Sequence, residues 1–514
     1  TVDNEFGQQE AHFIPRDSFR RRAAIFFWDN ESGDENLEWL QYSVTELLAQ
    51  DLRQNPFMLV SSPWDNMNYG FYNKMKQAGF ENGLDLPLNL KREVANTANR
   101  VYFVDGNIDH VNEEVRVSAR VWKTETLELL GETSARGTGL LALVDQVSEE
   151  IRGILDIPPG KGGLAGDLPL EETYGESETA LRHYIEGLNS ILFQNDWEES
   201  NRHFDAAIEA DPDFVMGWYM KGLSLWEQGD VAGSEDALAA ARNLDYRLPE
   251  RDRVRLKAIS YRIAGEQDKL EKFLRLQIQL RRDAASNRSL ARFLMFTGRL
   301  EEAKQHFKTA MELDSSDLRS YVHLADLERA TGNLDAAVRY ARLYLEAKPD
   351  DLDGYLLLGD LLLKTGDLNA AEERYEQAQL VEEPPLASTL RLALLAMRRA
   401  EWATARELIG EARAMASTPM QHSNVLAVEG WLEVRLGRIG RAIELAGERL
   451  EFNRQVMSPL QQIFNYDVAL IEYNISLGQL ETAEQMLQQT HDALQPPMNQ
   501  FLSFSEALLH ARKQ

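Results

Sequence analysis

The stretch from residue 331 to residue 378 contains one short pattern twice. The first copy, T-G-N-L-D-A-A, begins at Thr331, and the second copy, T-G-D-L-N-A-A, begins at Thr365, which is 34 residues later. Tyr321 and Tyr355 keep the same offset. A fixed offset of this length is the signature of a repeated supersecondary unit. The stretch therefore predicts that this part of the chain is a stack of similar units.

The turn in this pattern recurs along the carboxy-terminal part of the chain. Successive turns are 34, 36, 33, 34, 34, 34, 37 and 41 residues apart. Glycine suits such a turn because it enters the left-handed backbone region without a steric penalty. About nine antiparallel helix pairs are therefore expected between residues 173 and 514. Their turns are at Asn195, Gly229, Gly265, Gly298, Gly332, Gly366, Ala400, Gly437 and Gly478.

Small and large apolar residues recur at fixed distances from these turns. Small residues let two helices approach closely, and large residues fill the space to the next pair. Together with the 34-residue period, this arrangement resembles the tetratricopeptide repeat, in which each unit is a pair of helices. The alanines five residues after a turn include Ala303, Ala337, Ala371, Ala405 and Ala442, and the aromatic residues nine after a turn are Phe204, Phe307 and Tyr375.

The composition excludes several classes of function. The chain has 83 acidic and 55 basic residues, a formal net charge of −28, so it repels nucleic-acid phosphates and anionic lipid surfaces. Its 514 residues include no cysteine, which excludes disulfides, thiolate nucleophiles and cysteine-ligated metal centres. The sequence has no apolar run of about eighteen residues, the length that a membrane-spanning helix needs.

An α/β domain is expected before the repeats, between residues 23 and 157. Short apolar runs and one alternating run indicate strands, and apolar residues at helical spacing indicate helices. The predicted order is β-α-β-α-β-β-β-α, folded as an α/β sandwich. The expected strands are residues 23–28, 57–60, 101–108, 115–121 and 127–135, and the expected helices lie within residues 37–52, 71–83, 90–98 and 141–155.

Three segments of this domain carry a resemblance to a known family. They are F-F-W-D-N-E-S-G-D from Phe26, V-D-G-N-I from Val104 and I-P-P from Ile157. The domain is similar to the TolB amino-terminal-like domain. Followed by repeats, it resembles the extracytoplasmic region of bacterial membrane-anchored Ser/Thr protein kinases or related signalling proteins. The resemblance implies a periplasmic location at the inner membrane, with the cytoplasm as the alternative, and it carries no catalytic motif.

The remaining segments complete the domain organisation. Residues 1–22 are expected to form a polar leader or, because they end in three arginines, a juxtamembrane linker. Residues 158–172 begin with two prolines and four glycines within nine positions, which is typical of a linker between domains. The α/β domain then covers residues 23–157, and the tetratricopeptide solenoid covers residues 173–514.

Catalytic and metal-binding patterns are missing from the sequence. It contains no glycine-rich phosphate loop or catalytic loop of a protein kinase. The nine histidines are scattered, His183 and His203 are twenty residues apart, and no H-E-x-x-H pattern occurs. We therefore expect no enzyme activity, no cofactor and no metal. An unrecognised enzyme would need a site built from the insertion at residues 64–83.

The inner face of the solenoid is the predicted binding surface. The first helix of each pair lines this face. Four of the arginines between residues 288 and 329, namely Arg288, Arg292, Arg319 and Arg329, form a basic stripe there that would suit an acidic peptide or a carboxyl terminus. The alternative is that they pair with neighbouring acidic residues, and that Trp226 and Trp431 pack between helices. The predicted residues are Tyr219, Trp226, Arg288, Arg292, Met295, Arg319, Asp326, Arg329, Asp360, Lys364, Trp431, Asn465 and Glu472.

Two hypotheses for the function follow from these patterns. The first is a non-enzymatic sensor or scaffold region of a membrane-anchored signalling protein, which binds a protein or peptide in the solenoid. The second is a small-molecule sensor whose ligand lies between the α/β domain and the first repeats.

Overall fold

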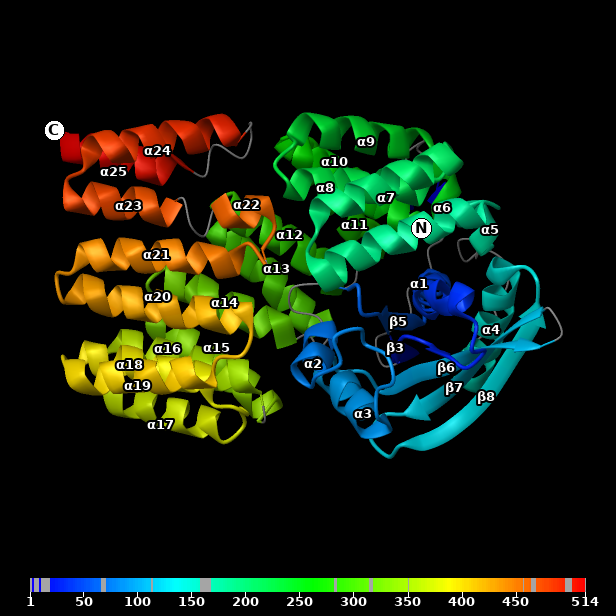
Figure 1. Ribbon diagram of the computed structural model, residues 1–514, viewed down its shortest axis with the longest axis horizontal. Coiled ribbons are helices and arrows are strands. Elements are labelled where there is room, and N and C mark those ends of the chain that lie inside the picture. Colours follow the sequence, from blue (N-terminus) through cyan, green and yellow to red (C-terminus); the bar gives the residue numbers. More distant parts are fainter. Residues whose placement is uncertain are drawn as a thin grey trace. The chain divides into compact units, whose positions relative to one another are not determined.

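The computed structural model describes residues 2–3, 9–10, 19–65, 71–111, 114–157, 168–281, 284–313, 318–349, 351–455, 457–463, 468–494 and 502–513. The chain divides into two compact units, Thr1–Glu266 and Gln267–Gln514 (Figure 1). The first unit holds the α/β domain and the first helices of the solenoid, and the second is entirely helical where it is described. The boundary therefore lies inside the predicted repeat region, not at the predicted linker.

The α/β domain is built on a mixed sheet. Its strands follow the order β5, β3, β6, β7, β8, and the short β4 pairs with β6. β3 is parallel to both β5 and β6, whereas β6, β7 and β8 form an antiparallel meander. The strands are β3 (Arg21–Ile25), β4 (Asp29–Asn30), β5 (Met58–Ser61), β6 (Tyr102–Val111), β7 (Glu114–Lys123) and β8 (Glu128–Gly137).

Helices cover the sheet on both faces. Val117, Ala119 and Val121 of β7 are buried on the face against which α4 packs, and α1 packs beside α4. On the opposite face, Lys91 of α3 reaches Asp105 of β6. The helices are α1 (Glu38–Gln54), α2 (Phe71–Gln77), α3 (Leu88–Thr97) and α4 (Leu140–Ile154). The predicted α/β fold class is confirmed, with boundaries within a few residues of those expected.

The predicted leader and linker are described only in part. In the leader, Val2–Asp3 (β1) pairs antiparallel with Gln9–Glu10 (β2), and β3 begins inside it at Arg21. In the linker, residues 158–167 lie outside the described residues. The helix α5 (Leu170–Tyr174) begins within the linker's predicted span, and its end residues are buried.

The solenoid begins within the first unit. A five-residue π-helical turn, Ser190–Gln194, follows α6, and α1 of the α/β domain packs against α6. The two parts of this unit therefore share a core. Its repeat helices are α6 (Glu178–Asn189), α7 (Trp197–Ala210), α8 (Val215–Glu227), α9 (Val231–Asn243) and α10 (Glu250–Ile263).

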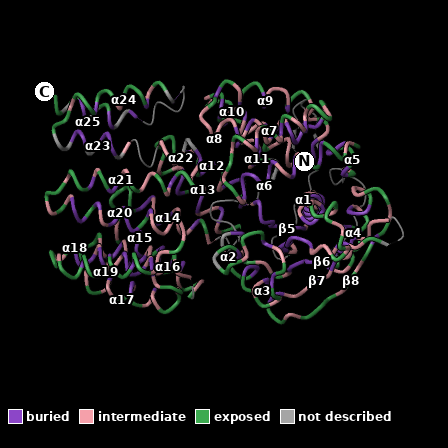
Figure 2. The backbone as a smooth tube through the Cα atoms, viewed as in Figure 1, coloured by how far each residue is buried: buried purple, intermediate pink, exposed green. Residues whose placement is uncertain are grey.

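The second unit continues the helix pairs. Buried and exposed residues alternate along its helices, as one-sided packing requires (Figure 2). Its helices are α11 (Gln267–Arg281), α12 (Ala284–Phe296), α13 (Leu300–Leu313), α14 (Leu318–Ala330), α15 (Leu334–Ala347), α16 (Leu352–Thr365), α17 (Leu368–Gln379), α18 (Leu386–Arg398), α19 (Trp402–Met415), α20 (Pro419–Arg435), α21 (Ile439–Asn453), α22 (Pro459–Gln462), α23 (Val468–Leu477), α24 (Leu480–Ala493) and α25 (Ser503–Lys513).

The predicted turns are confirmed by their backbone angles. Each of the predicted turn residues has a positive φ, including the two that are not glycine, Asn195 at 54° and Ala400 at 61°. Five residues after the turn, a small residue is buried in most pairs, for example Ser234 and Ala337. Leu270 takes this position after Gly265. The boundary between the two units falls in this third pair, so its two helices, α10 and α11, belong to different units.

Among the residues that the structure describes, none of the helices combines the length and the apolar character that crossing a lipid bilayer requires.

Candidate functional site

The predicted inner-face residues lie on the first helices of their pairs. Asn465 lies outside the described residues. The others divide between the two units, because α8 belongs to the first unit and the remaining helices belong to the second. α8 carries Tyr219 and Trp226, α12 carries Arg288, Arg292 and Met295, α14 carries Arg319, Asp326 and Arg329, α16 carries Asp360 and Lys364, α20 carries Trp431, and α23 carries Glu472.

The predicted basic stripe contains both paired and exposed cations. Arg329 Nη2 lies 3.1 Å from Asp326 Oδ1 on the same helix. This arginine therefore pairs with a neighbouring acidic residue, which was the alternative to ligand binding. Arg292 and Lys364 are exposed, and neither has an ion-pair partner among the described residues. Arg319 is also exposed. The cations available to a ligand are therefore fewer than the sequence predicted.

Asp360 holds helices together. Tyr375 Oη of α17 donates a hydrogen bond of 2.8 Å to Asp360 Oδ1, and Arg391 Nε of α18 lies 2.9 Å from the same oxygen. Burial, with the nearby Asp360 carboxylate, raises the pKa of the Tyr375 hydroxyl, which keeps it a donor. Sequence reasoning missed Arg391. The sequence did contain a signal for it: Arg391 lies nine residues before the turn at Ala400. Residues at similar distances before other turns were among the predicted inner-face residues.

The aromatic candidates differ in accessibility. Trp431 is 50% exposed, so half of its surface is not packed between helices and is open to a ligand. Trp226 is half-buried. Tyr219 is only 7% exposed and offers little surface to a ligand. Burial raises the pKa of its hydroxyl, while Arg255 of α10 opposes that shift. Met295 and Glu472 are half-buried.

Side chains of the α/β domain and of the first repeats meet where a ligand cleft was expected. Glu46 of α1 is 3% exposed and accepts hydrogen bonds from Tyr184 Oη of α6 at 3.2 Å and from Gln50 Nε2 at 2.8 Å. The Tyr184 ring in turn contacts the Tyr174 ring of α5. Burial raises the pKa of the Glu46 carboxyl, although Arg53 opposes that shift. This junction serves as a polar core between the two parts of the unit.

A pocket of about 400 Å³ lies on the α/β domain itself. It opens near the start of α1, beside the loop that follows β4. Three carboxylates line it, and so does Tyr42. Burial, together with Glu38, raises the pKa of the Tyr42 hydroxyl to about 12. Such a lining favours a cationic ligand. Its residues are Asn30, Gly33, Asp34, Glu35, Glu38, Gln41, Tyr42, Asn82 and Leu84.

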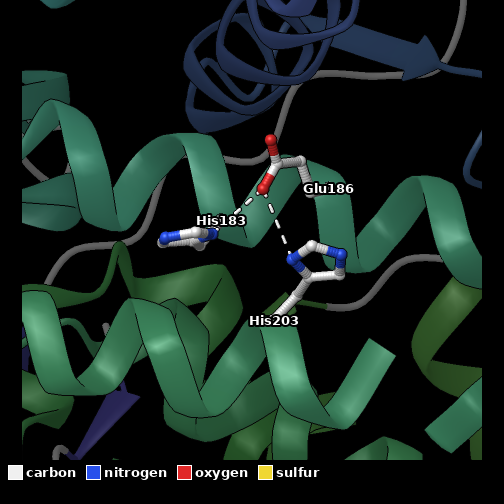
Figure 3. A group of neighbouring side chains, drawn as sticks. All are labelled: His183, Glu186 and His203. Atoms are coloured by element: carbon white, nitrogen blue, oxygen red, sulfur yellow. Dashed lines mark hydrogen bonds and ion pairs between the residues drawn. The ribbon is translucent and has the colours of Figure 1, made fainter. Parts of the chain in front are cut away.

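Two histidines and a glutamate meet on the first helix pair (Figure 3). Glu186 Oε2 lies 3.0 Å from His183 Nδ1 on the same helix and 3.3 Å from His203 Nδ1 on α7. The three ligand atoms lie within 4.8 Å of one another. The hairpin therefore brings together two histidines that are twenty residues apart in the sequence.

Comparison with protein families identifies the repeats. Tetratricopeptide repeat models match residues 189–247, 288–351 and 352–383. The carboxy-terminal region therefore contains tetratricopeptide repeats, as its period predicted. The matches begin at residue 189, so they do not test the resemblance of the amino-terminal domain. A comparison with curated proteins gives no significant match.

Solved structures with a similar fold include other repeat proteins. Yeast Tom70 is 16% identical, with a TM-score of 0.43, over 59% of this chain and 66% of Tom70, slightly under two thirds of its length. A tetratricopeptide repeat protein from Parabacteroides merdae is 15% identical, with a TM-score of 0.34, over 58% of this chain and 99% of its own. A chain of the APC/C hetero-tetramer Cut9–Hcn1 is 14% identical, with a TM-score of 0.31, over 73% of this chain and 83% of its own. These likenesses concern the fold alone.

Proposed function

We propose that this chain is a non-catalytic scaffold that binds a protein partner through the first helices of its second unit. The observation that carries this proposal is the position of Trp431, which is 50% exposed on α20. It lies six residues before its turn, and the exposed Arg292 lies six residues before the turn at Gly298. Equivalent positions of different repeats thus present an aromatic anchor and an exposed cation. Repeat solenoids bind partners along extended faces of this kind.

The chemistry of these positions indicates the class of ligand. Tryptophan and arginine are the residues that contribute most often to binding hot spots. In a chain with a net charge of −28, the exposed Arg292 and Lys364, which have no ion-pair partner in the part of the chain that the structure describes, favour a segment that carries carboxylates. We therefore expect an acidic peptide segment with at least one large apolar side chain.

Affinity capture with matched variants tests the proposal. The wild-type chain is used as bait in an extract of its native cells, and Trp431→Ala and Arg292→Glu are tested beside it. Both variants are expected to lose the same partner, and its affinity for the wild type should fall as salt concentration rises, because exposed charges are screened.

Two control variants lie on other helices of the same unit. Leu380→Ala removes an apolar side chain that is 85% exposed at the end of α17, and Arg406→Glu reverses an exposed charge on α19. Both controls should retain the partner. The proposal would be contradicted if Trp431→Ala and Arg292→Glu still captured the partner. It would also be contradicted if the control variants lost the partner to the same extent.

We also infer a signalling context from the resemblance to the TolB amino-terminal-like domain. The chain would then be the extracytoplasmic part of a membrane-anchored protein. Alkaline phosphatase fused after Gln514 of the native gene product tests this location, because the enzyme is active only after export. An inactive fusion that is expressed in full would place the chain in the cytoplasm instead.

The pocket on the α/β domain supports small-molecule sensing as a second candidate function. Its lining by Asp34, Glu35 and Glu38 favours a cationic metabolite. A thermal-shift screen of polyamines and basic amino acids is expected to find a stabilising ligand, since binding to the folded state raises the melting temperature. Glu38→Gln should reduce that shift. A shift that is unchanged in this variant would exclude the pocket.

A further inference from the structure

We propose that His183, Glu186 and His203 bind a divalent transition-metal ion of the zinc class. The ligand atoms are Nδ1 of both histidines and Oε2 of the glutamate, with Oε2 close to both nitrogens. His183 and Glu186 lie on one helix, and His203 approaches them from the next helix (Figure 3). Imidazole nitrogens combined with a carboxylate oxygen are the donor set that Zn²⁺ and its neighbours in the first transition row accept. Nothing in the proposed scaffold function requires this site.

The spacing of these atoms fits a metal centre. Zinc binds nitrogen and oxygen ligands at about 2.0–2.2 Å, so two ligand atoms of a tetrahedral site are about 3.3 Å apart. The two distances from Glu186 Oε2, 3.0 Å to His183 and 3.3 Å to His203, lie close to that value. All three ligand atoms lie within 4.8 Å of one another, so side-chain movements that bring the two imidazoles closer would complete the spacing.

Two of the three ligands, His203 and Glu186, are also oriented by a second partner. His203 Nε2, the ring nitrogen that faces away from Glu186, lies 3.4 Å from Glu199 Oε1. Glu186 Oε1, the oxygen not used for the metal, accepts a hydrogen bond of 3.2 Å from Arg182 Nε. Such outer partners select the tautomer of a ligating histidine and hold a ligating carboxylate in place.

The backbone beneath the cluster is firmly packed. Gly187 follows Glu186, and Phe204 follows His203. A Cβ atom on Gly187 would lie only 2.5 Å from Phe204 Cε1, and the Phe204 ring is fully buried. The absence of a side chain at Gly187 thus lets α6 and α7 approach closely, which fixes the two halves of the site.

The cluster is accessible to an ion from solvent. The side chains of His183, Glu186 and His203 are 34%, 31% and 24% exposed. Three protein ligands leave at least one coordination position for water or for an exchangeable ligand, as in zinc sites that are not purely structural. The ion would bridge α6 and α7 at the start of the solenoid.

Zinc titration of the full chain, after treatment with a chelator and its removal, tests the proposal. Calorimetry is expected to show one saturable Zn²⁺ site, and Co²⁺ should give visible absorption bands of a nitrogen- and oxygen-ligated ion. The double variant His183→Ala/His203→Ala should lose both signals. His110→Ala, which removes an exposed histidine from β6, should keep them.

Glu199 provides a second measurement that separates a metal site from a simple hydrogen-bonded trio. Glu199→Gln should weaken Zn²⁺ binding by about tenfold to a hundredfold, the usual cost of losing an outer partner. Glu198→Gln, at the neighbouring exposed position of the same helix turn, should leave the affinity unchanged. Unfolding of the metal-free variants should match that of the wild type.

Two results would overturn the proposal. One is a wild-type protein that binds Zn²⁺ no better than the double histidine variant. The other is a Co²⁺ spectrum that persists when both histidines are replaced.

Discussion

Asp105 illustrates how single residues are stabilised in the α/β domain. It is 2% exposed, and its carboxylate accepts from Lys91 Nζ at 2.8 Å, from Arg120 Nε at 3.0 Å and from Trp122 Nε1 at 2.9 Å. Burial alone would raise the pKa of this carboxyl, but Lys91 and the other donors outweigh it and the net pKa is lowered. Asp105 therefore remains charged in the folded state.

Replacing Asp105 should strongly destabilise the protein. Asp105→Asn leaves the buried Lys91 ammonium without a counter-charge, which costs about 3–5 kcal/mol of unfolding free energy. Urea unfolding at neutral pH measures the loss. Asp109→Asn, which removes a more exposed carboxylate from the same strand, is the control and should cost about 1 kcal/mol or less. An equal cost for both variants would contradict this account.

Glu46 should make stability depend on pH in the opposite sense from Asp105. Its folded pKa is raised above the ordinary value of 4.5 by burial, so the native state retains a proton that the unfolded chain has lost. Stability from this group therefore falls as pH rises from 4.5 towards the raised pKa.

Glu46→Gln removes that dependence while preserving the shape of the side chain. The variant should gain stability relative to the wild type with rising pH, by at most about 1.4 kcal/mol for each pH unit within this window. Urea unfolding at pH 5, 6, 7 and 8 measures the difference. A difference that stays constant across these pH values would show that Glu46 does not titrate there.

The helix pair is the element on which the solenoid depends, and its turn requires a positive φ. Most of the turns use glycine, as Gly332 does at 82°. Ala400 adopts 61° with a side chain present, which costs about 1–2 kcal/mol relative to a relaxed backbone. Five residues after its turn, the third pair has Leu270, where other pairs have a buried small residue. The boundary between the two compact units falls in this pair.

Exchanging the turn residues should shift stability in opposite directions. Ala400→Gly should raise the unfolding free energy by up to about 1 kcal/mol, and Gly332→Ala should lower it by about 1 kcal/mol. Thermal unfolding measures both. Ala403→Gly, an exposed position inside α19, is the control and should be destabilising by about 0.5–1 kcal/mol. Loss of stability in Ala400→Gly would contradict the strain at this turn.

At the scale of the whole molecule, the α/β domain and the first repeats belong to one compact unit. The division at Glu266 and the buried contact between Glu46 and Tyr184 both support this grouping. The linker that the sequence predicts near residue 160 therefore does not mark where the chain separates into compact units.

Two fragments should differ in stability because of this shared core. Residues 19–266 retain the packing between α1 and α6, whereas residues 19–157 expose the α1 surface that α6 covers. The longer fragment should unfold in one cooperative transition at a higher temperature, and the shorter one should melt lower or aggregate. Circular dichroism on heating distinguishes them. Equal melting temperatures would show that the α/β domain is independent of the repeats.

Local features of the chain were predictable from the sequence alone. The turn positions and the order of helices and strands along the chain follow from patterns within a few tens of residues, where backbone sterics and apolar spacing act. Gly332 and Asn195 were identified as turns for this reason, and both have a positive φ. The class of repeat followed from the same period.

The tertiary structure alone decided which side chains meet. His183 and His203 became neighbours because α6 and α7 pack closely over Gly187, and Glu46 became buried because α6 covers α1. Likewise, Arg329 is paired while Arg292 is exposed, although both lie in the same predicted stripe. The physical reason is that burial, desolvation and metal-ligand geometry depend on distances in space, which the linear spacing of residues on different helices does not determine.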